Sequence, residues 1–409
     1  MEITLYPSNW LYNAGVIGLL RVLEQAGENV QSYLRDDGSV EVDSGIFNEE
    51  RFGEVKIPKC IKSLIEHLVP DSDLNDWKED KNGKKNKEKY EDFFKKFDNN
   101  DFGYKFIRAG NKLFSSNTPF QNLVQPTEWR SFKFTELLLK IPQIANRASH
   151  NSTQIRCNLC SENEINPKSE NGINPKSDLE QRLATLQITH LQELGGSLGK
   201  FPNSFWNLEQ SSPICILCVY LILHYRESFL KLLDNSEIFI NAPSFKTMWY
   251  LNKYARDVVG RTGMKETKKI LGISLIELAA RLEAQLGTWT SMNLEVITKD
   301  GDNIDFFSLP YHIILLLTGK EVASLLNQIG EFKILNMVLD GNFREILELG
   351  ERILKIALKP QKERNKSERD FVNSTVKLER NKNKLSNFSS NLLELYALLD
   401  DKTSKGVLI

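Results

Sequence analysis

Two Cys-x-x-Cys pairs constrain the fold of this chain more than any other feature of its sequence. They occupy residues 157–160 and 215–218. Two residues between cysteines let both thiolates reach one tetrahedral zinc ion, at Zn–S distances of about 2.3 Å. Two such pairs fill all four ligand positions. The sequence therefore predicts one structural zinc ion with four ligands: Cys157, Cys160, Cys215 and Cys218.

The ligand set also bears on chemistry, because four thiolates leave no open position for water and so predict a non-catalytic ion. The stretch between the pairs, residues 161–214, exceeds the usual spacing of about 15–20 residues. A polar segment, Ile-Asn-Pro-Lys-Ser, occurs at 165–169 and again at 173–177, which accounts for part of the excess. Two redox pairs, or a coincidence of spacing, are the alternative interpretations. A redox pair usually follows a strand, and none is evident before Cys157.

Composition sets the broad class. The chain has 409 residues, of which 41% are hydrophobic, enough for two to three domains of ~100–200 residues. A formal net charge of −1 means that any nucleic-acid binding must come from local basic patches. The start of the chain lacks the pattern of a signal peptide, and the apolar run at 306–317 is too short for a membrane span. We expect a soluble, cytoplasmic protein, in which paired cysteines favour metal over disulfide.

We expect an α+β fold that is mainly helical and has three parts. Residues 1–150 form an N-terminal α+β domain, and residues 151–225 form an inserted zinc-binding module with a glycine-rich loop. Residues 226–409 form a mainly helical C-terminal domain, a helical bundle. Cys60 stands alone on an apolar stretch and is expected in the core.

Hydrophobic periodicity predicts the individual elements. Helices are expected over residues 8–26, 57–69, 214–225, 273–286, 342–359 and 385–399. Alternation predicts strands over 38–47 and 102–106 and a hairpin over 293–308. Asn342, with Glu345 three residues later, predicts a capping box at the start of its helix.

No catalytic motif stands out. The segment Gly-Gly-Ser-Leu-Gly-Lys at 195–200 is similar to a phosphate-binding loop, but its glycine spacing is one residue short. Phe201 also stands where Ser or Thr would bind magnesium. The histidines, including His224 on an apolar helix, form no metal-binding pair motif. We therefore expect no enzymatic activity, although carboxylates that meet only in the fold leave a nuclease open as an alternative.

Local composition suggests contact with nucleic acid. Two polar loops with aromatic residues, 111–125 and 200–207, offer side chains suited to reading or separating bases. Chosen by residue type and loop context, the candidates are Asn111, Lys112, Ser115, Ser116, Asn117, Gln121, Asn122, Lys200, Asn203, Ser204 and Trp206.

Basic residues outnumber acidic ones over 355–384, as expected of a segment that contacts phosphates. The candidates for contact with the strand backbone are Lys362, Arg364, Lys366, Arg369, Lys377, Arg380, Lys382 and Lys384. A solvated charged linker is the alternative for this segment. A second charge run, over 78–96, is interpreted as a solvated loop, with a phosphate-contacting arm as its alternative.

The segment at 10–23, Trp-Leu-Tyr-Asn-Ala-Gly-Val-Ile-Gly-Leu-Leu-Arg-Val-Leu, resembles the N-terminus of the large subunit of type I-B CRISPR Cascade complexes. That family typically has an aromatic residue, an Asn-Ala-Gly or similar, a second glycine and an apolar helix. Its members often carry a four-cysteine zinc site in mid-chain and end in a helical region. The direct match covers about fifteen residues plus the four cysteines.

The resemblance implies a non-catalytic subunit of a crRNA-guided complex in antiviral defence. Its partners would be the crRNA-containing Cascade subunits and target double-stranded DNA. It would recognise the protospacer-adjacent motif, aid duplex opening, stabilise the R-loop and recruit a separate nuclease-helicase. Family members are often longer, with a small-subunit-like bundle at the C-terminus, whereas this chain ends at Ile409. The alternatives are a metal-dependent nuclease and a zinc-stabilised scaffold that contacts only protein.

Overall fold

The computed structural model describes most of the chain. The described residues are 2–74, 91–98, 100–115, 118, 120–138, 155–160, 164–165, 179, 182–183, 185–186, 212–262, 270, 272–274, 294–300, 303–309, 311–375 and 384–404. Residues 275–286 of the predicted helix over 273–286, the glycine-rich loop and most of the charge run over 78–96 fall outside them.

The chain divides into two compact units. Unit 1 comprises Met1–Phe229, Ser244–Lys246 and Lys299–Ile304. Unit 2 comprises Leu230–Pro243, Thr247–Thr298 and Asp305–Ile409. Both pairs of cysteines belong to unit 1. The described residues are mostly helical with small antiparallel sheets, so the predicted class is confirmed at that level.

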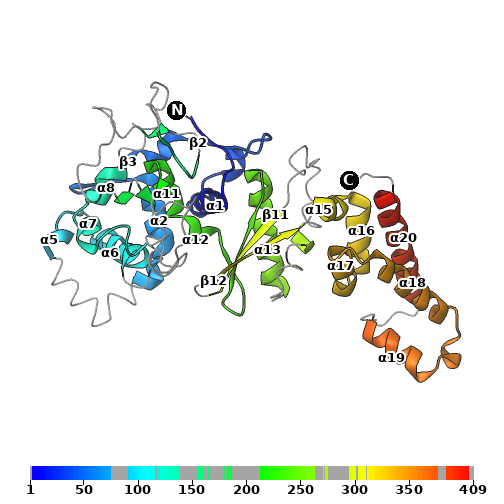
Figure 1. The fold of residues 1–409 in the computed structure, drawn as a ribbon. Helices are drawn as coiled ribbons and strands as arrows, with labels where there is room; N and C mark the ends of the chain where they lie inside the picture. Colours follow the sequence, from blue (N-terminus) through cyan, green and yellow to red (C-terminus); the bar gives the residue numbers. More distant parts are fainter. Residues whose placement is uncertain are drawn as a thin grey trace. The chain divides into compact units, whose positions relative to one another are not determined.

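Helix α1 (Trp10–Gln25) is the centre of unit 1. Its residues from Leu11 to Leu20 are all buried, and a helix that is apolar on every side needs partners all round. Those partners are α2 (Lys59–Leu68), α11 (Ile216–Ile222) and α12 (Tyr225–Ser228) (Figure 1). The predicted helix over 8–26 is therefore confirmed, while the one over 214–225 is two helices, α11 and α12.

Short strands flank this helical core. Strand β1 (Glu2–Leu5) pairs antiparallel with β2 (Val40–Asp43), with Leu5 opposite Val40. Strands β3 (Glu49–Phe52) and β4 (Val55–Pro58) form a second antiparallel pair. The strand predicted over 38–47 is thus confirmed in β2, although its last residues form the 3₁₀ helix η2 (Ser44–Phe47).

The strand predicted over 102–106 is wrong, because these residues lie in helix α6 (Asn100–Phe114). Phe102 and Phe106 are four residues apart, which places them on one face of a helix as readily as alternation places them on one face of a strand. Tertiary contacts decide, since the rings of both lie about 6 Å from that of Phe97, at 6.2 and 6.1 Å. Helix α5 (Glu91–Phe94) precedes α6 in the chain. Helices α7 (Pro126–Arg130) and α8 (Lys133–Leu138) follow α6.

Unit 2 begins with a sheet in the order β12-β11-β10-β9. Its strands are β9 (Leu230–Lys231), β10 (Glu237–Asn241), β11 (Leu294–Asp300) and β12 (Asn303–Leu309). Helix α13 (Phe245–Thr262) follows β10, and its buried Asn252 bonds to both the N–H and the C=O of Ile240. The predicted hairpin over 293–308 is confirmed in the neighbouring strands β11 and β12.

The rest of unit 2 is helical. The helices are α15 (Tyr311–Thr318), α16 (Lys320–Ile329), α17 (Phe332–Leu339), α18 (Phe343–Ala357), α19 (Lys366–Thr375) and α20 (Lys384–Ser404), with the 3₁₀ helix η6 (Gln361–Glu363) between α18 and α19. Helices α18 and α20 pack closely, and the Ser389 hydroxyl donates to the Gly350 carbonyl at 2.9 Å. No helix among the described residues has the length and apolar character to cross a membrane.

One predicted feature of α18 is wrong. Asn342 does precede the helix, but its side chain makes no capping hydrogen bond. Its backbone, at φ −84° and ψ 55°, is not in the extended conformation from which a capping side chain reaches back to the first turn.

Candidate metal centre

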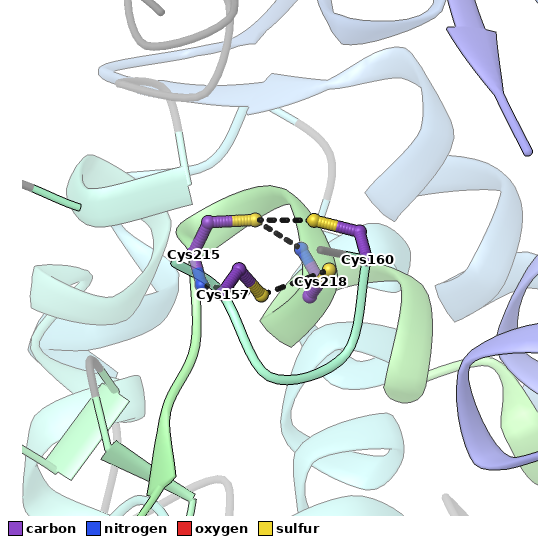
Figure 2. Close-up of side chains that lie close together, drawn as sticks. All are labelled: Cys157, Cys160, Cys215 and Cys218. Atoms are coloured by element: carbon purple, nitrogen blue, oxygen red, sulfur yellow. Dashed lines mark hydrogen bonds between the residues drawn. The ribbon is translucent and has the colours of Figure 1, made fainter. Parts of the chain in front are cut away.

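The four cysteines of the predicted site meet in one cluster, although 54 residues separate the two pairs in the sequence. All four sulfur atoms lie within 4.8 Å of one another. The sulfur atoms of Cys157 and Cys218 are 3.7 Å apart, and those of Cys160 and Cys215 are 3.9 Å apart (Figure 2). A tetrahedral ion with Zn–S distances of about 2.3 Å needs sulfur atoms about 3.8 Å apart. The cluster therefore has the dimensions of a four-thiolate metal site.

Each pair comes from a different kind of element. Cys157 directly follows the short strand β5 (Ile155–Arg156), which pairs antiparallel with β6 (Glu164–Ile165), so the expectation that no strand precedes Cys157 is wrong. A strand of two residues is too short to show an alternating pattern in the sequence. The meeting of both pairs in one cluster, and not the absence of a strand, favours a shared metal ion over two separate redox pairs. Cys215 is the N-cap of α11, and its sulfur accepts the Cys218 N–H at 3.4 Å. The Cys215 N–H donates in turn to the Cys157 sulfur at 3.3 Å. These bonds orient the sulfur atoms and place amide donors where thiolate charge would lie.

Burial and hydrogen bonds among the cysteines together shift the pKa values of these thiols. Cys157, Cys215 and Cys218 are buried, and Cys160 is half-buried. Burial raises the pKa of the Cys218 thiol well above its usual value. Hydrogen bonding to Cys157 and Cys160, together with burial, raises the pKa of Cys215 as well. A divalent cation would offset the charge of buried thiolates, so the donor set fits a metal such as zinc. Cys60, outside the cluster, is buried in the core as predicted.

The N-terminal segment contacts the first pair of cysteines directly. The carbonyl of Leu159, which lies between Cys157 and Cys160, accepts a bond from the Ser8 hydroxyl at 2.6 Å. It accepts a second bond from the Asn9 side-chain amide at 3.1 Å. Sequence reasoning did not single out Ser8 or Asn9, since about 150 residues separate them from Leu159.

The same segment also packs against the helix that carries the second pair. At Gly15, an added Cβ would lie 2.7 Å from the Leu221 carbonyl oxygen of α11. At Gly18 it would collide with the carbonyl of His224, at the start of α12. Both glycines are therefore needed for backbone-to-backbone contact between α1 and the chain that follows Cys218.

A half-buried polar cluster lies at the other end of this contact. The Arg21 guanidinium donates to the Glu227 carbonyl at 2.5 Å, and His67 bonds to the Glu227 carboxylate. Burial alone would raise the pKa of Glu227, but the hydrogen bond and charge of His67 and the charge of Arg21 hold it below its usual value. His224 is fully buried and bonds to the Tyr220 carbonyl at 3.0 Å. These contacts fasten α1 and α2 to α12.

Several of the predicted DNA-contacting residues have partners within the chain. Lys112 lies in α6, not in a loop, and its ammonium donates to the Leu68 carbonyl at 2.6 Å. Asn111, also in α6, accepts a bond from Arg130 at 3.2 Å. The polar loop predicted from residue 111 thus begins only after Phe114. Gln121 is half-buried and Asn122 is exposed. Ser115, directly after α6, is half-buried, and its hydroxyl donates to the Asn111 carbonyl. The remaining loop candidates lie outside the described residues: Ser116, Asn117, Lys200, Asn203, Ser204 and Trp206.

The candidates in the basic segment, residues 355–384, likewise include exposed residues, one residue bonded within the chain, and residues that are not described. Lys362, Lys366 and Arg369 are exposed on η6 and α19. Arg364 instead donates to the carbonyls of Lys359, at 3.2 Å, and Ala357, at 3.3 Å, which closes the C-terminus of α18. Three further candidates and one side chain lie outside the described residues: Lys377, Arg380, Lys382 and the side chain of Lys384.

Comparison with known proteins adds no further support, because no family model, curated protein or solved structure matches the chain. The cysteine cluster and its contacts with α1 are therefore the observations on which a proposed function rests. Within the described part of the chain, the four cysteines are the group of His, Cys, Asp or Glu side chains whose ligand atoms lie close enough together to hold a metal ion.

Proposed function

We propose that the chain is the non-catalytic large subunit of a crRNA-guided type I-B Cascade complex. In this role it recognises the protospacer-adjacent motif on duplex DNA, aids duplex opening and stabilises the R-loop. It then recruits a nuclease-helicase that acts in trans. Pairing with the crRNA reads most of the target, so the protein itself needs to read only a short motif.

One observation carries this proposal: residues 10–23 and the four cysteines form a single packed module. The resemblance rests on these two sequence features, which lie far apart in the chain. Gly15 and Gly18 bring α1 into backbone contact with α11 and α12, and Cys215 is the N-cap of α11. The joint packing of both features in one unit supports the proposal.

The proposed metal is zinc, with a structural role. Four thiolates suit zinc and complete its tetrahedral shell, so no position remains for a reacting water. The ion would tie the segment after β5 to the start of α11. Free energy of metal binding would then contribute directly to the folding of unit 1.

Co-purification tests the proposal. The full chain, tagged, is co-expressed with the other subunits of such a complex and a crRNA. We expect the crRNA and the repeated backbone subunit to be recovered with it, and the assembly to bind duplex DNA that carries the motif more tightly than duplex DNA without it. Recovery of the chain with neither RNA nor backbone subunit would overturn the assignment.

The same preparation separates the alternatives. Labelled DNA incubated with the protein and Mg²⁺ or Mn²⁺ is expected to stay intact. Cleavage that a single carboxylate substitution abolishes would establish a nuclease instead. Association with protein partners alone, without RNA or DNA, would favour a scaffold.

A further inference from the structure

We propose that Ser8, Asn9 and Asn13 are positioning residues for the metal centre, which act through the Leu159 carbonyl. They hold the first cysteine pair in the orientation that binds the metal. This inference rests on the proposed metal site, and goes beyond it by assigning a role to three side chains that are not ligands. We call these three residues the N-terminal clasp.

The first step is the contact itself. The Leu159 side chain is fully buried, and its carbonyl accepts both clasp bonds, from Ser8 at 2.6 Å and from Asn9 at 3.1 Å. A carbonyl with two donors in a poorly solvated place is held more firmly than one that exchanges bonds with water. The short segment between the two ligands is therefore fixed from outside the cluster.

Peptide geometry carries this constraint to the ligands. In a trans peptide, the carbonyl of Leu159 and the N–H of Cys160 point in opposite directions. Holding the oxygen on the Ser8 side thus fixes the direction of the Cys160 N–H and the course of the chain into Cys160. Since Cys157 lies two residues before Leu159, a change in this peptide would alter the spacing of both sulfur atoms.

Within the clasp, Asn13 holds the backbone of Ser8 in place. This residue is buried, 1% exposed, and lies in the part of α1 from Leu11 to Leu20, whose other residues are apolar or aromatic. Its amide donates to the Ser8 carbonyl at 2.8 Å, and its oxygen accepts the Ser8 N–H at 2.8 Å. Asn9 is similarly engaged at both ends, because its oxygen caps the Tyr12 N–H at 3.1 Å. Burying a side-chain amide costs free energy unless the amide is hydrogen-bonded. The amide of Asn13 bonds to Ser8, which in turn donates to the Leu159 carbonyl.

The expected consequence is coupling between the clasp and the metal. Partners that orient metal ligands typically contribute about 10- to 100-fold in metal affinity. The double variant Ser8→Ala/Asn9→Ala is expected to lose zinc affinity by a factor in that range, and each single variant by less. Ser8→Thr keeps the hydroxyl and is expected to restore most of the affinity. By linkage, zinc should stabilise the clasp by the same factor.

The experiment is a competition for zinc between the full chain and a chromogenic zinc chelator, with affinity and release rate as readouts. Ser32→Ala is the matched control, because the Ser32 hydroxyl makes the same kind of bond, to the Asn29 carbonyl at 2.7 Å, at an exposed site in unit 1. This control is expected to bind and release zinc as the wild type does.

The outcomes distinguish the two proposals. A wild-type chain that binds no zinc would refute the metal centre. A wild type that binds zinc, with clasp variants that bind and release it identically, would overturn the clasp alone. Thermal unfolding with and without zinc excludes a merely structural role, since coupling predicts a larger loss of stability in the zinc-loaded protein. Equal losses in both forms would also overturn the clasp.

Discussion

At the residue scale, His224 offers a direct test of the contact between α1 and α12. Burial lowers its pKa from 6.5 to about 4, so it is neutral at pH 7. In the unfolded chain it binds a proton below about pH 6.5, whereas the folded state resists protonation down to about pH 4. The free energy of unfolding therefore falls as the pH drops from about 6.5 to 4, by about 3 kcal/mol from this side chain.

Urea denaturation between pH 7 and pH 4.5 measures this dependence against His224→Gln. The variant is expected to be less stable at pH 7, because Gln cannot reproduce the bonds to Tyr220. It should nevertheless lose less stability than the wild type as the solution is acidified. Parallel curves for the two proteins would contradict the buried, neutral state of His224.

The glycines of α1 provide the second residue-scale prediction. Gly18→Ala places a methyl group against the His224 carbonyl, and is expected to cost roughly 1–3 kcal/mol or more as α1 is displaced. Gly260→Ala in α13 is the matched control, because an added Cβ there meets nothing within 4 Å. The control is expected to gain ~0.5–1 kcal/mol from helix propensity. Denaturation midpoints measure both, and equal effects would show that α1 and α12 do not pack as described.

At this scale, the role of a residue can be predicted from the sequence only when its partners lie close to it along the chain. The cysteine ligands are recognisable because each pair is local and has a defined spacing. The clasp is not, since Ser8 and Asn9 meet Leu159 only after folding. A buried polar residue inside an apolar helix, Asn13, is the one local sign that such a contact exists.

At the element scale, periodicity identified some long helices, missed α13 and failed at α6, where a short apolar alternation was taken for a strand. Helices α1, α18 and α20 have unambiguous patterns and were expected within a few residues of their ends. The alternation of Phe102, Tyr104 and Phe106 fits a strand, whereas Phe102 and Phe106 also share one face of a helix, and aromatic packing in unit 1 decides for the helix.

The basic segment carries the element-scale prediction for DNA binding. Reversal of the three exposed charges, Lys362→Glu, Lys366→Glu and Arg369→Glu, spares Arg364, which closes α18. The proposed complex is expected to bind DNA more weakly, with a shallower dependence of affinity on salt, because fewer counterions are released.

The control for this change reverses the same amount of charge at exposed lysines elsewhere, Lys56, Lys231 and Lys333. It should change binding less than the reversal on η6 and α19 does. If both triple variants bind alike, the segment acts only through the net charge of the protein and makes no specific contact with the strand.

At the scale of the whole molecule, the metal centre belongs to one of the two units. Both cysteine pairs, α1 and α11 lie in unit 1, whereas α18 and α20 lie in unit 2. Composition and pattern predicted a mainly helical α+β chain with a mid-chain cysteine site. They did not predict how small strands and distant segments close around α1, because those contacts join residues remote in sequence.

Removal of the metal is therefore expected to affect the units unequally. After chelation of the full chain, amide hydrogen exchange should increase in α1 and α11, which the cysteine module braces. Amides of α18 and α20 should keep their protection. Uniform loss of protection along the chain would contradict a metal that stabilises unit 1 specifically.

The most direct test of the central claim is the metal content of the full chain, purified without added metal and measured by elemental analysis. We predict one equivalent of zinc per chain. Zinc should be lost in Cys157→Ser and Cys218→Ser but retained in Cys60→Ala, whose cysteine is buried outside the cluster. A metal-free wild-type protein with native stability, or cluster variants that retain full zinc, would contradict the account.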